Sequence, residues 1–105
     1  MNLIIKDNYD EMSKATGDFV IDYVNKKADT LLCIAGGETP YGLFKYLIEA
    51  SKNGKVDFSK CKFVSLDEWV GLGRETRGSC IETLYNQFFD LIPVTEDQIC
   101  FFDGL

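Results

Sequence analysis

Two adjacent carboxylates, Asp67 and Glu68, directly follow an apolar run of strand character, Cys61–Leu66. Ligands of open α/β sheets bind in the crevice outside the carboxyl ends of the strands. A carboxylate placed there can exchange a proton with a C–H bond next to a carbonyl, and partial shielding by Trp69 would favour its uncharged form. The alternative is a solvated acidic turn, which is the commoner fate of such pairs.

A second candidate site, Gly36-Gly37-Glu38-Thr39, follows the apolar run Leu31–Ala35 and precedes Pro40. Glycines let the backbone approach a ligand closely, and the free N–H groups of a new helix favour an anion such as phosphate. We predict a phosphate cradle built from Gly36, Gly37 and Thr39, provided that the Glu38 carboxylate points away. The alternative is a tight turn that needs glycine for backbone reasons alone. The segment matches neither a dinucleotide-binding nor a Walker A motif.

These two sites follow successive predicted strands. If the strands are neighbours in one parallel sheet, the carboxyl ends of both meet at the same edge. We therefore expect the glycine loop and Asp67 to face one bound molecule. Together they favour an enzyme that acts on a small phosphorylated metabolite.

Three polar residues in and after the long loop Asp67–Gly78 are weaker candidates. Arg74 and Arg77 could contact an anionic substrate, although loop arginines are more often solvated. Ser79 is expected to cap a helix, because the sequence has no histidine to activate it as a nucleophile.

The composition of the 105 residues is that of one ordinary globular domain, with a net charge of −6 and 46% hydrophobic residues. There is no basic run of five residues, no apolar stretch of the roughly 20 residues that span a bilayer, and no signal-peptide pattern. We expect no nucleic-acid or membrane partner and a cytoplasmic location. With no histidine and no CxxC pair, a metal site is not expected, and the four cysteines are expected to be buried reduced thiols: Cys33, Cys61, Cys80 and Cys100.

The pattern of elements alternates strand and helix. Strands are predicted at Leu3–Lys6, Leu31–Ala35, Cys61–Leu66 and Ile99–Phe102, with Leu31–Ala35 covered on both faces. Helices are predicted after caps at Asn8, Thr39 and Ser79. Their inner faces are expected to carry Met12, Ala15, Phe19, Val20, Tyr23 and Val24, then Tyr41, Phe44, Leu47 and Ile48, then Ile81, Leu84, Tyr85, Phe88 and Phe89. This predicts a single α/β domain over residues 1–105, three-layered and Rossmann-like, with a mainly parallel sheet flanked by helices.

Two motifs give the chain a family resemblance: Ile34-Ala35-Gly36-Gly37-Glu38-Thr39-Pro40 and Ser65-Leu66-Asp67-Glu68-Trp69-Val70-Gly71-Leu72. They resemble the glucosamine-6-phosphate deaminase/isomerase and 6-phosphogluconolactonase superfamily. The second motif resembles the deaminase branch, with Trp69 in place of a tyrosine, whereas lactonases more typically carry Asp-Glu-Arg. The resemblance extends through the predicted helix after Ser79 to Phe101-Phe102-Asp103-Gly104.

The resemblance implies a reaction as well as a fold. Gly36, Gly37 and Thr39 match the loop that holds the sugar phosphate. Asp67 matches the carboxylate that moves a proton between C2 and C1 of the opened amino sugar, and Glu68 matches its acidic neighbour. The implied reaction converts glucosamine 6-phosphate to fructose 6-phosphate and ammonia without a cofactor.

The resemblance also implies a longer protein, because family members are about twice as long and carry an Asp-Gly-His segment in their second half. We therefore expect these residues to be the N-terminal half of an enzyme and inactive alone. A homo-oligomer is compatible with this expectation. The alternatives are a 6-phosphogluconolactonase, another sugar-phosphate isomerase of the same fold, or a sugar-phosphate sensor without catalysis.

Overall fold

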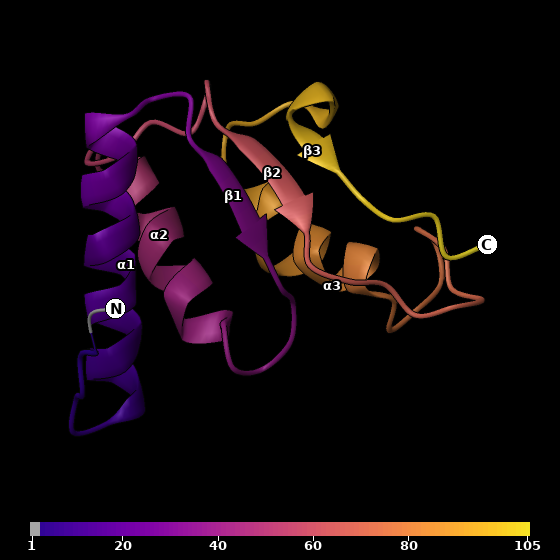
Figure 1. Ribbon diagram of the computed structural model, residues 1–105, viewed down its shortest axis with the longest axis horizontal. Coiled ribbons are helices and arrows are strands. Elements are labelled where there is room, and N and C mark those ends of the chain that lie inside the picture. The colour runs from indigo at the N-terminus through magenta and orange to yellow at the C-terminus, as the bar shows by residue number, and fades with distance from the viewer. Residues whose placement is uncertain (1–2) are drawn as a thin grey trace.

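The computed structural model describes residues 3–105 and alternates helices and strands as the sequence predicts (Figure 1). Three α-helices and three strands form the described part of the chain, together with two short 3-10 helices. In chain order these are α1 (Tyr9–Lys26), β1 (Leu31–Ile34), α2 (Tyr41–Lys52), β2 (Lys62–Ser65), α3 (Cys80–Gln87), η1 (Phe89–Leu91), η2 (Glu96–Gln98) and β3 (Ile99–Cys100).

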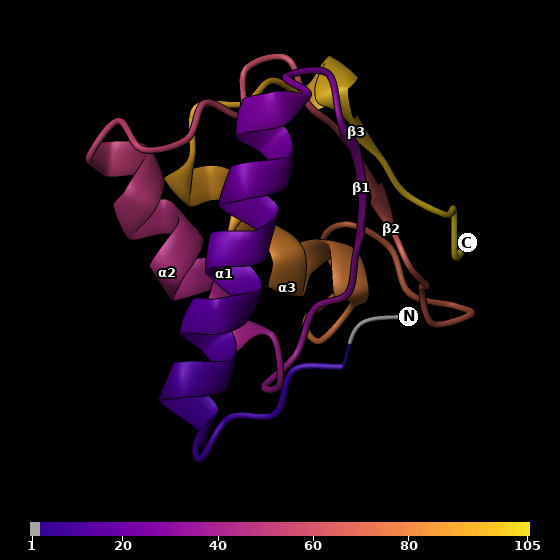
Figure 2. The ribbon, with the colours of Figure 1, turned by 60° about the vertical axis from the view of Figure 1, so that its left-hand side comes forward.

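The strands form one parallel sheet in the order β1-β2-β3. Figure 2 shows the sheet nearly edge-on, with α1, α2 and α3 on the same side. The described residues therefore provide two layers of the predicted α/β architecture, a sheet and one layer of helices. The prediction that Leu31–Ala35 is covered on both faces was wrong, because Leu31 is 66% exposed and Cys33 is exposed on the side that no helix covers.

Phenylalanines fill the space between the sheet and α3. The Phe88 ring stacks on Phe44 with centroids 4.8 Å apart, and it meets the edges of Phe58 and Phe63 at 5.8 and 6.0 Å. Phe44, Phe58 and Phe63 are themselves fully buried. These contacts fix α3 beneath the centre of the sheet, which places the N-terminus of α3 beside the end of β2.

Two of the three predicted helix caps are confirmed. The Asn8 side chain accepts a hydrogen bond from the Glu11 N–H at 2.9 Å, and Ser79 Oγ accepts one from the Glu82 N–H at 3.1 Å. The cap predicted at Thr39 was wrong, because Pro40 occupies the N-cap of α2 and no side chain caps it. An N–H group in the first turn of α2 is instead bound by a hydroxyl from α1, since Tyr9 Oη accepts a hydrogen bond from the Gly42 N–H at 2.8 Å.

The structure also corrects the extent of two strands and the inner face of α1. Residues 3–6 are exposed and form no strand, and β3 covers only Ile99–Cys100 of the predicted Ile99–Phe102. In α1, Phe19 is 61% exposed, whereas the buried positions are Ser13, Gly17 and Val24. Small residues face α2 because the Tyr46 ring lies close to Gly17, within 2.2 Å of where a Cβ atom would stand.

Gln98 is the buried polar residue that ties β3 to the start of β2. Its Nε2 donates to the carbonyl oxygens of Phe58 and Cys61, both at 2.9 Å, and its Oε1 accepts from the Thr95 N–H at 3.0 Å. Gln98→Leu leaves these backbone groups without partners, so we expect the free energy of unfolding to fall by about 2–3 kcal/mol. Urea denaturation followed by circular dichroism measures this. The exposed amide of Asn86 provides the control, since Asn86→Leu should change stability by less than about 0.5 kcal/mol.

Candidate functional site at the carboxyl edge of the sheet

The two predicted sites lie at the ends of neighbouring strands. Ile34 of β1 pairs with Ser65 of β2, and the Leu66 N–H donates to the Ile34 carbonyl at 2.8 Å. The glycine loop begins two residues after Ile34, and Asp67 stands two residues after Ser65. The structure therefore brings the glycine loop and the acidic pair to the same edge of the sheet, as the order of the motifs predicts.

Both glycines of the loop have a structural reason to be glycine. Gly37 has a φ of +125°, a conformation that side chains with a Cβ rarely adopt. A Cβ atom on Gly36 would stand 3.2 Å from Thr83 Cγ2 and 3.3 Å from Leu84 Cγ, so α3 packs tightly against the loop. The geometry of the turn and the packing of α3 therefore account for both glycines, and the phosphate cradle stays a prediction.

Gln87 anchors the glycine loop and was not predicted from the sequence. Its Nε2 donates to the Gly37 carbonyl at 2.9 Å, and its Oε1 accepts from the Gly37 N–H at 3.3 Å. On the other side of the loop, Tyr9 Oη lies 3.0 Å from the carbonyl oxygens of both Glu38 and Thr39. Side chains from α3 and α1 therefore hold the loop in one conformation, which is the preorganisation that an anion site needs.

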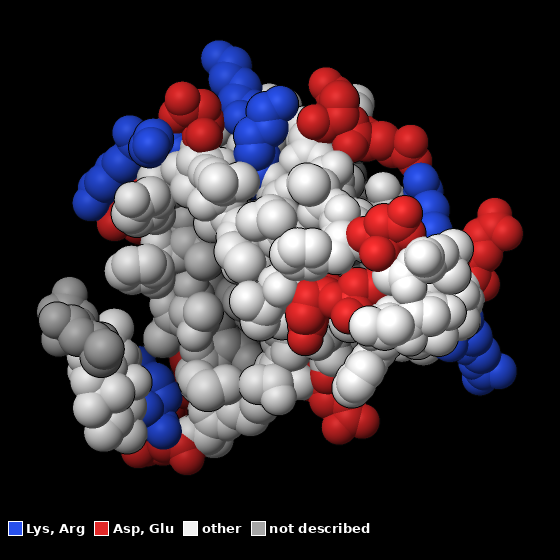
Figure 3. Space-filling model, turned by 45° about the vertical axis from the view of Figure 1, so that its right-hand side comes forward, with Lys and Arg blue, Asp and Glu red and all other residues white. Residues whose placement is uncertain are grey.

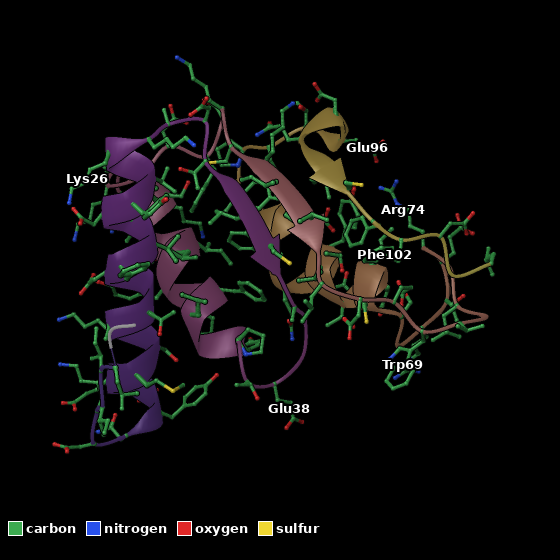
Figure 4. The ribbon with its side chains drawn as sticks, in the orientation of Figure 1. Lys26, Glu38, Trp69, Arg74, Glu96 and Phe102 are labelled. Carbon is green, nitrogen blue, oxygen red and sulfur yellow. The ribbon has the colours of Figure 1, made fainter. Side chains whose placement is uncertain are left out.

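Some of the loop amides remain free for a ligand. The Gly37 N–H is engaged by Gln87, but among residues 3–105 the N–H groups of Glu38 and Thr39 have no hydrogen-bond partner. A pocket of about 470 Å³ opens beside them, lined by Met12, Thr16, Cys33, Ile34, Ala35, Gly36, Glu38, Thr39, Pro40, Leu43 and Phe44. Figure 4 shows the Glu38 side chain extending outward from the tip of the loop, so it need not repel an anion held by the amides.

The backbone of Asp67 is held by one buried side chain. Ser65 Oγ, which is buried, donates to the Asp67 carbonyl oxygen at 2.9 Å, and the Asp67 carboxylate is exposed. The predicted shielding by Trp69 was wrong. Trp69 is itself 66% exposed and extends away from the rest of the molecule in Figure 4, since the loop leaves the sheet immediately after the acidic pair.

Glu68 joins the end of β2 to the N-terminus of α3. One carboxylate oxygen accepts from the N–H groups of Trp69 at 2.9 Å and Cys80 at 2.8 Å, and the other accepts from Ile81 at 3.0 Å. Burial by itself would raise the pKa of Glu68, but the hydrogen bonds to its charged form outweigh this effect and lower the pKa below its usual 4.5. The carboxylate therefore stays ionised and fixes the loop to the helix.

Glu68→Gln tests this positioning contact through the pH dependence of stability. Because the pKa of Glu68 is lowered by folding, its stabilising contribution is fully present above about 4.5 and is lost as the pH falls through the folded value. We expect the variant to unfold more easily by about 1–2 kcal/mol at pH 7, as hydrogen bonds to charged groups are the stronger ones. The difference should shrink below pH 4.5. Urea titrations at a series of pH values measure it, and a difference independent of pH contradicts the contact.

Two of the three weaker candidates, Arg74 and Ser79, have structural roles. The Arg74 guanidinium donates to Glu96 at 2.6 Å and lies 4.5 Å from the centre of the Tyr85 ring, so it links the loop to η2 and α3. Arg77 is exposed, and Ser79 caps α3 as predicted. Of the cysteines, Cys61 is buried as expected, whereas the prediction of burial was wrong for Cys33 and Cys100. Burial raises the pKa of the Cys61 thiol.

The face shown in Figure 3 is largely uncharged at its centre, and acidic side chains gather on its right-hand side. No helix within residues 3–105 is long and apolar enough to cross a membrane. In the same part of the chain, no three His, Cys, Asp or Glu side chains are grouped so that they could hold a metal ion.

The fold and the site define an α/β protein whose candidate ligand edge combines a helix-preceding glycine loop with a carboxylate. No model of a known protein family matches the chain. The chain is 38% identical over all its 105 residues to glucosamine-6-phosphate deaminase of Clostridium botulinum strain Hall, and 40% identical to that of Clostridium tetani strain Massachusetts. It spans 43% and 44% of the lengths of these two relatives.

Solved structures agree with these relatives. A monomeric glucosamine-6-phosphate deaminase of the NagB superfamily superposes with a TM-score of 0.93 and 26% identity, over 99% of this chain and 43% of that chain. A 6-phosphogluconolactonase from Trypanosoma brucei shares the fold at a TM-score of 0.76 and 16% identity, over 96% of this chain and 39% of that chain. The chain is thus similar over its whole length to part of these glucosamine-6-phosphate deaminases, and it shares the fold of the solved NagB-superfamily structure.

Proposed function

We propose that this chain supplies the N-terminal half of a glucosamine-6-phosphate deaminase, an enzyme that converts glucosamine 6-phosphate and water to fructose 6-phosphate and ammonia. The observation that carries the proposal is the meeting of the glycine loop and Asp67 at one sheet edge. The Asp-Glu-Trp-Val-Gly-Leu segment and the deaminase relatives favour this reaction over lactone hydrolysis.

Each site residue receives one role in this proposal. The free amides of the loop Gly36-Gly37-Glu38-Thr39, with the Thr39 hydroxyl, bind the sugar phosphate. Asp67 removes the proton from C2 of the opened amino sugar, which is acidified by the neighbouring C1 carbonyl, and returns it to C1. The C2 imine that follows is hydrolysed by water to the ketone and ammonia. Glu68 acts through the backbone, by holding Asp67 and the start of α3 in place.

The whole protein in this proposal is a cytoplasmic enzyme with a small sugar phosphate as its substrate. The 105 residues span less than half of each deaminase relative. We expect that they bind sugar phosphate weakly and do not release ammonia by themselves. Turnover requires a chain of the relatives' length.

Ammonia release tests the proposed reaction. The assay uses a chain of the relatives' full length that contains these residues, either as encoded or completed with the C-terminal part of the Clostridium tetani relative. Glucosamine 6-phosphate should yield ammonia and fructose 6-phosphate in equal amounts, and 6-phosphogluconolactone should be hydrolysed no faster than in buffer. Lactone hydrolysis without ammonia release would establish the lactonase alternative, and sugar-phosphate binding without either reaction would establish the sensor.

A further inference from the structure

Cys80, the first residue of α3, touches both members of the acidic pair. Its Sγ lies 3.7 Å from Asp67 Oδ1, and its backbone N–H donates to Glu68 Oε1 at 2.8 Å. The second contact fixes the backbone of Cys80, and with it the position of the thiol. Within residues 3–105, no other side chain makes a hydrogen bond or an ion pair with the Asp67 carboxylate.

The direction of the hydrogen bond follows from the charges around the thiol. Partial burial, and then the carboxylates of Glu68 and Asp67, raise the pKa of Cys80 to about 11. The thiol is therefore protonated at neutral pH and can donate a hydrogen bond to a carboxylate oxygen. The S–H group is the donor and Asp67 Oδ1 the acceptor. A protonated thiol is also a poor nucleophile, which leaves Cys80 as a hydrogen-bond donor.

We infer that Cys80 is a positioning residue for Asp67, its S–H holding the exposed carboxylate in one orientation at the carboxyl edge of the sheet. The inference rests on the proposed function in so far as Asp67 is the proton carrier. An exposed aspartate samples several rotamers, and only the productive one lies within reach of a C–H bond of the substrate. A weak, fixed donor selects that orientation without neutralising the carboxylate.

The first test measures the contact without any need for enzymatic activity. The native chain and the Asp67→Asn variant are alkylated with iodoacetamide between pH 7 and 10, and peptide mass spectrometry gives the rate at each cysteine. Removing the carboxylate charge should speed alkylation of Cys80 by about three- to tenfold at pH 8.5. The exposed thiols of Cys33 and Cys100 are internal controls and should keep their rates. An unchanged Cys80 rate overturns the inference.

The second test measures the consequence in the full-length enzyme. Cys80→Ala should lower kcat by about three- to tenfold with KM within twofold, because the phosphate contacts are untouched. Cys80→Ser retains a donor at the same position and should recover most of kcat. An equal loss in both variants indicates packing alone and overturns the inference, as does a Cys80→Ala enzyme with native kcat. If the native enzyme releases no ammonia, the proposed function fails, while the alkylation result still decides the contact.

Discussion

Asp67→Asn is expected to lower the kcat of the proposed full-length deaminase by about 10²–10⁴-fold while KM changes by less than about threefold. The asparagine amide has the size of the carboxylate but cannot accept the C2 proton. In the proposed function the sugar phosphate is bound by amides of a different loop, which Gln87 and Tyr9 anchor, so substrate binding should be retained. Steady-state ammonia release and equilibrium binding of the substrate measure the two effects separately.

A matched control lies at the opposite edge of the sheet. Asp29 is an exposed aspartate in the turn before β1, and Asp29→Asn should leave both kcat and KM unchanged. Because the two substitutions alter the net charge equally, a difference between their effects on kcat must come from the position of the aspartate. An Asp67→Asn enzyme that keeps more than about a tenth of the native kcat would remove Asp67 from its proposed role as base.

Local signals in the sequence predicted the features that depend on near neighbours. The caps at Asn8 and Ser79 each bind an N–H three residues ahead, so residue type and spacing suffice to find them. The order of strands and helices follows from runs of apolar residues in the same way. Since parallel strands with short crossovers are usually neighbours, the meeting of the two candidate sites also followed from the order of the motifs.

The features that were missed depend on partners distant in the chain. Thr39 is a good capping residue, but the N–H of Gly42 at the start of α2 is bound by the hydroxyl of Tyr9, which lies 33 residues earlier in α1. Glu68 has the residue type of a proton carrier, yet its partners are N–H groups 12 and 13 residues later. The exposure of Leu31 and Cys33 depends on whether a further layer covers the other face of the sheet. The residue pattern of β1 does not encode the presence of that layer.

Phe88→Ala is expected to lower the free energy of unfolding by about 3–5 kcal/mol, a large part of the total stability of a domain of this size. Phe88 is 1% exposed, and its ring contacts the rings of Phe44, Phe58 and Phe63. Truncation removes these contacts and leaves a cavity that the rigid sheet on one side cannot fill. Urea denaturation followed by tryptophan fluorescence and circular dichroism measures the loss.

Phe102→Ala is the matched control, because Phe102 is 59% exposed and its truncation should cost less than about 1 kcal/mol. Similar losses for the two variants would contradict the core position of Phe88. Phe88→Ala should also loosen the candidate site, because Phe88 directly follows Gln87, whose side chain anchors Gly37. Hydrogen exchange of the Gly37 amide should therefore speed up in Phe88→Ala and stay native in Phe102→Ala, because the packing of α3 places Gln87 against the glycine loop.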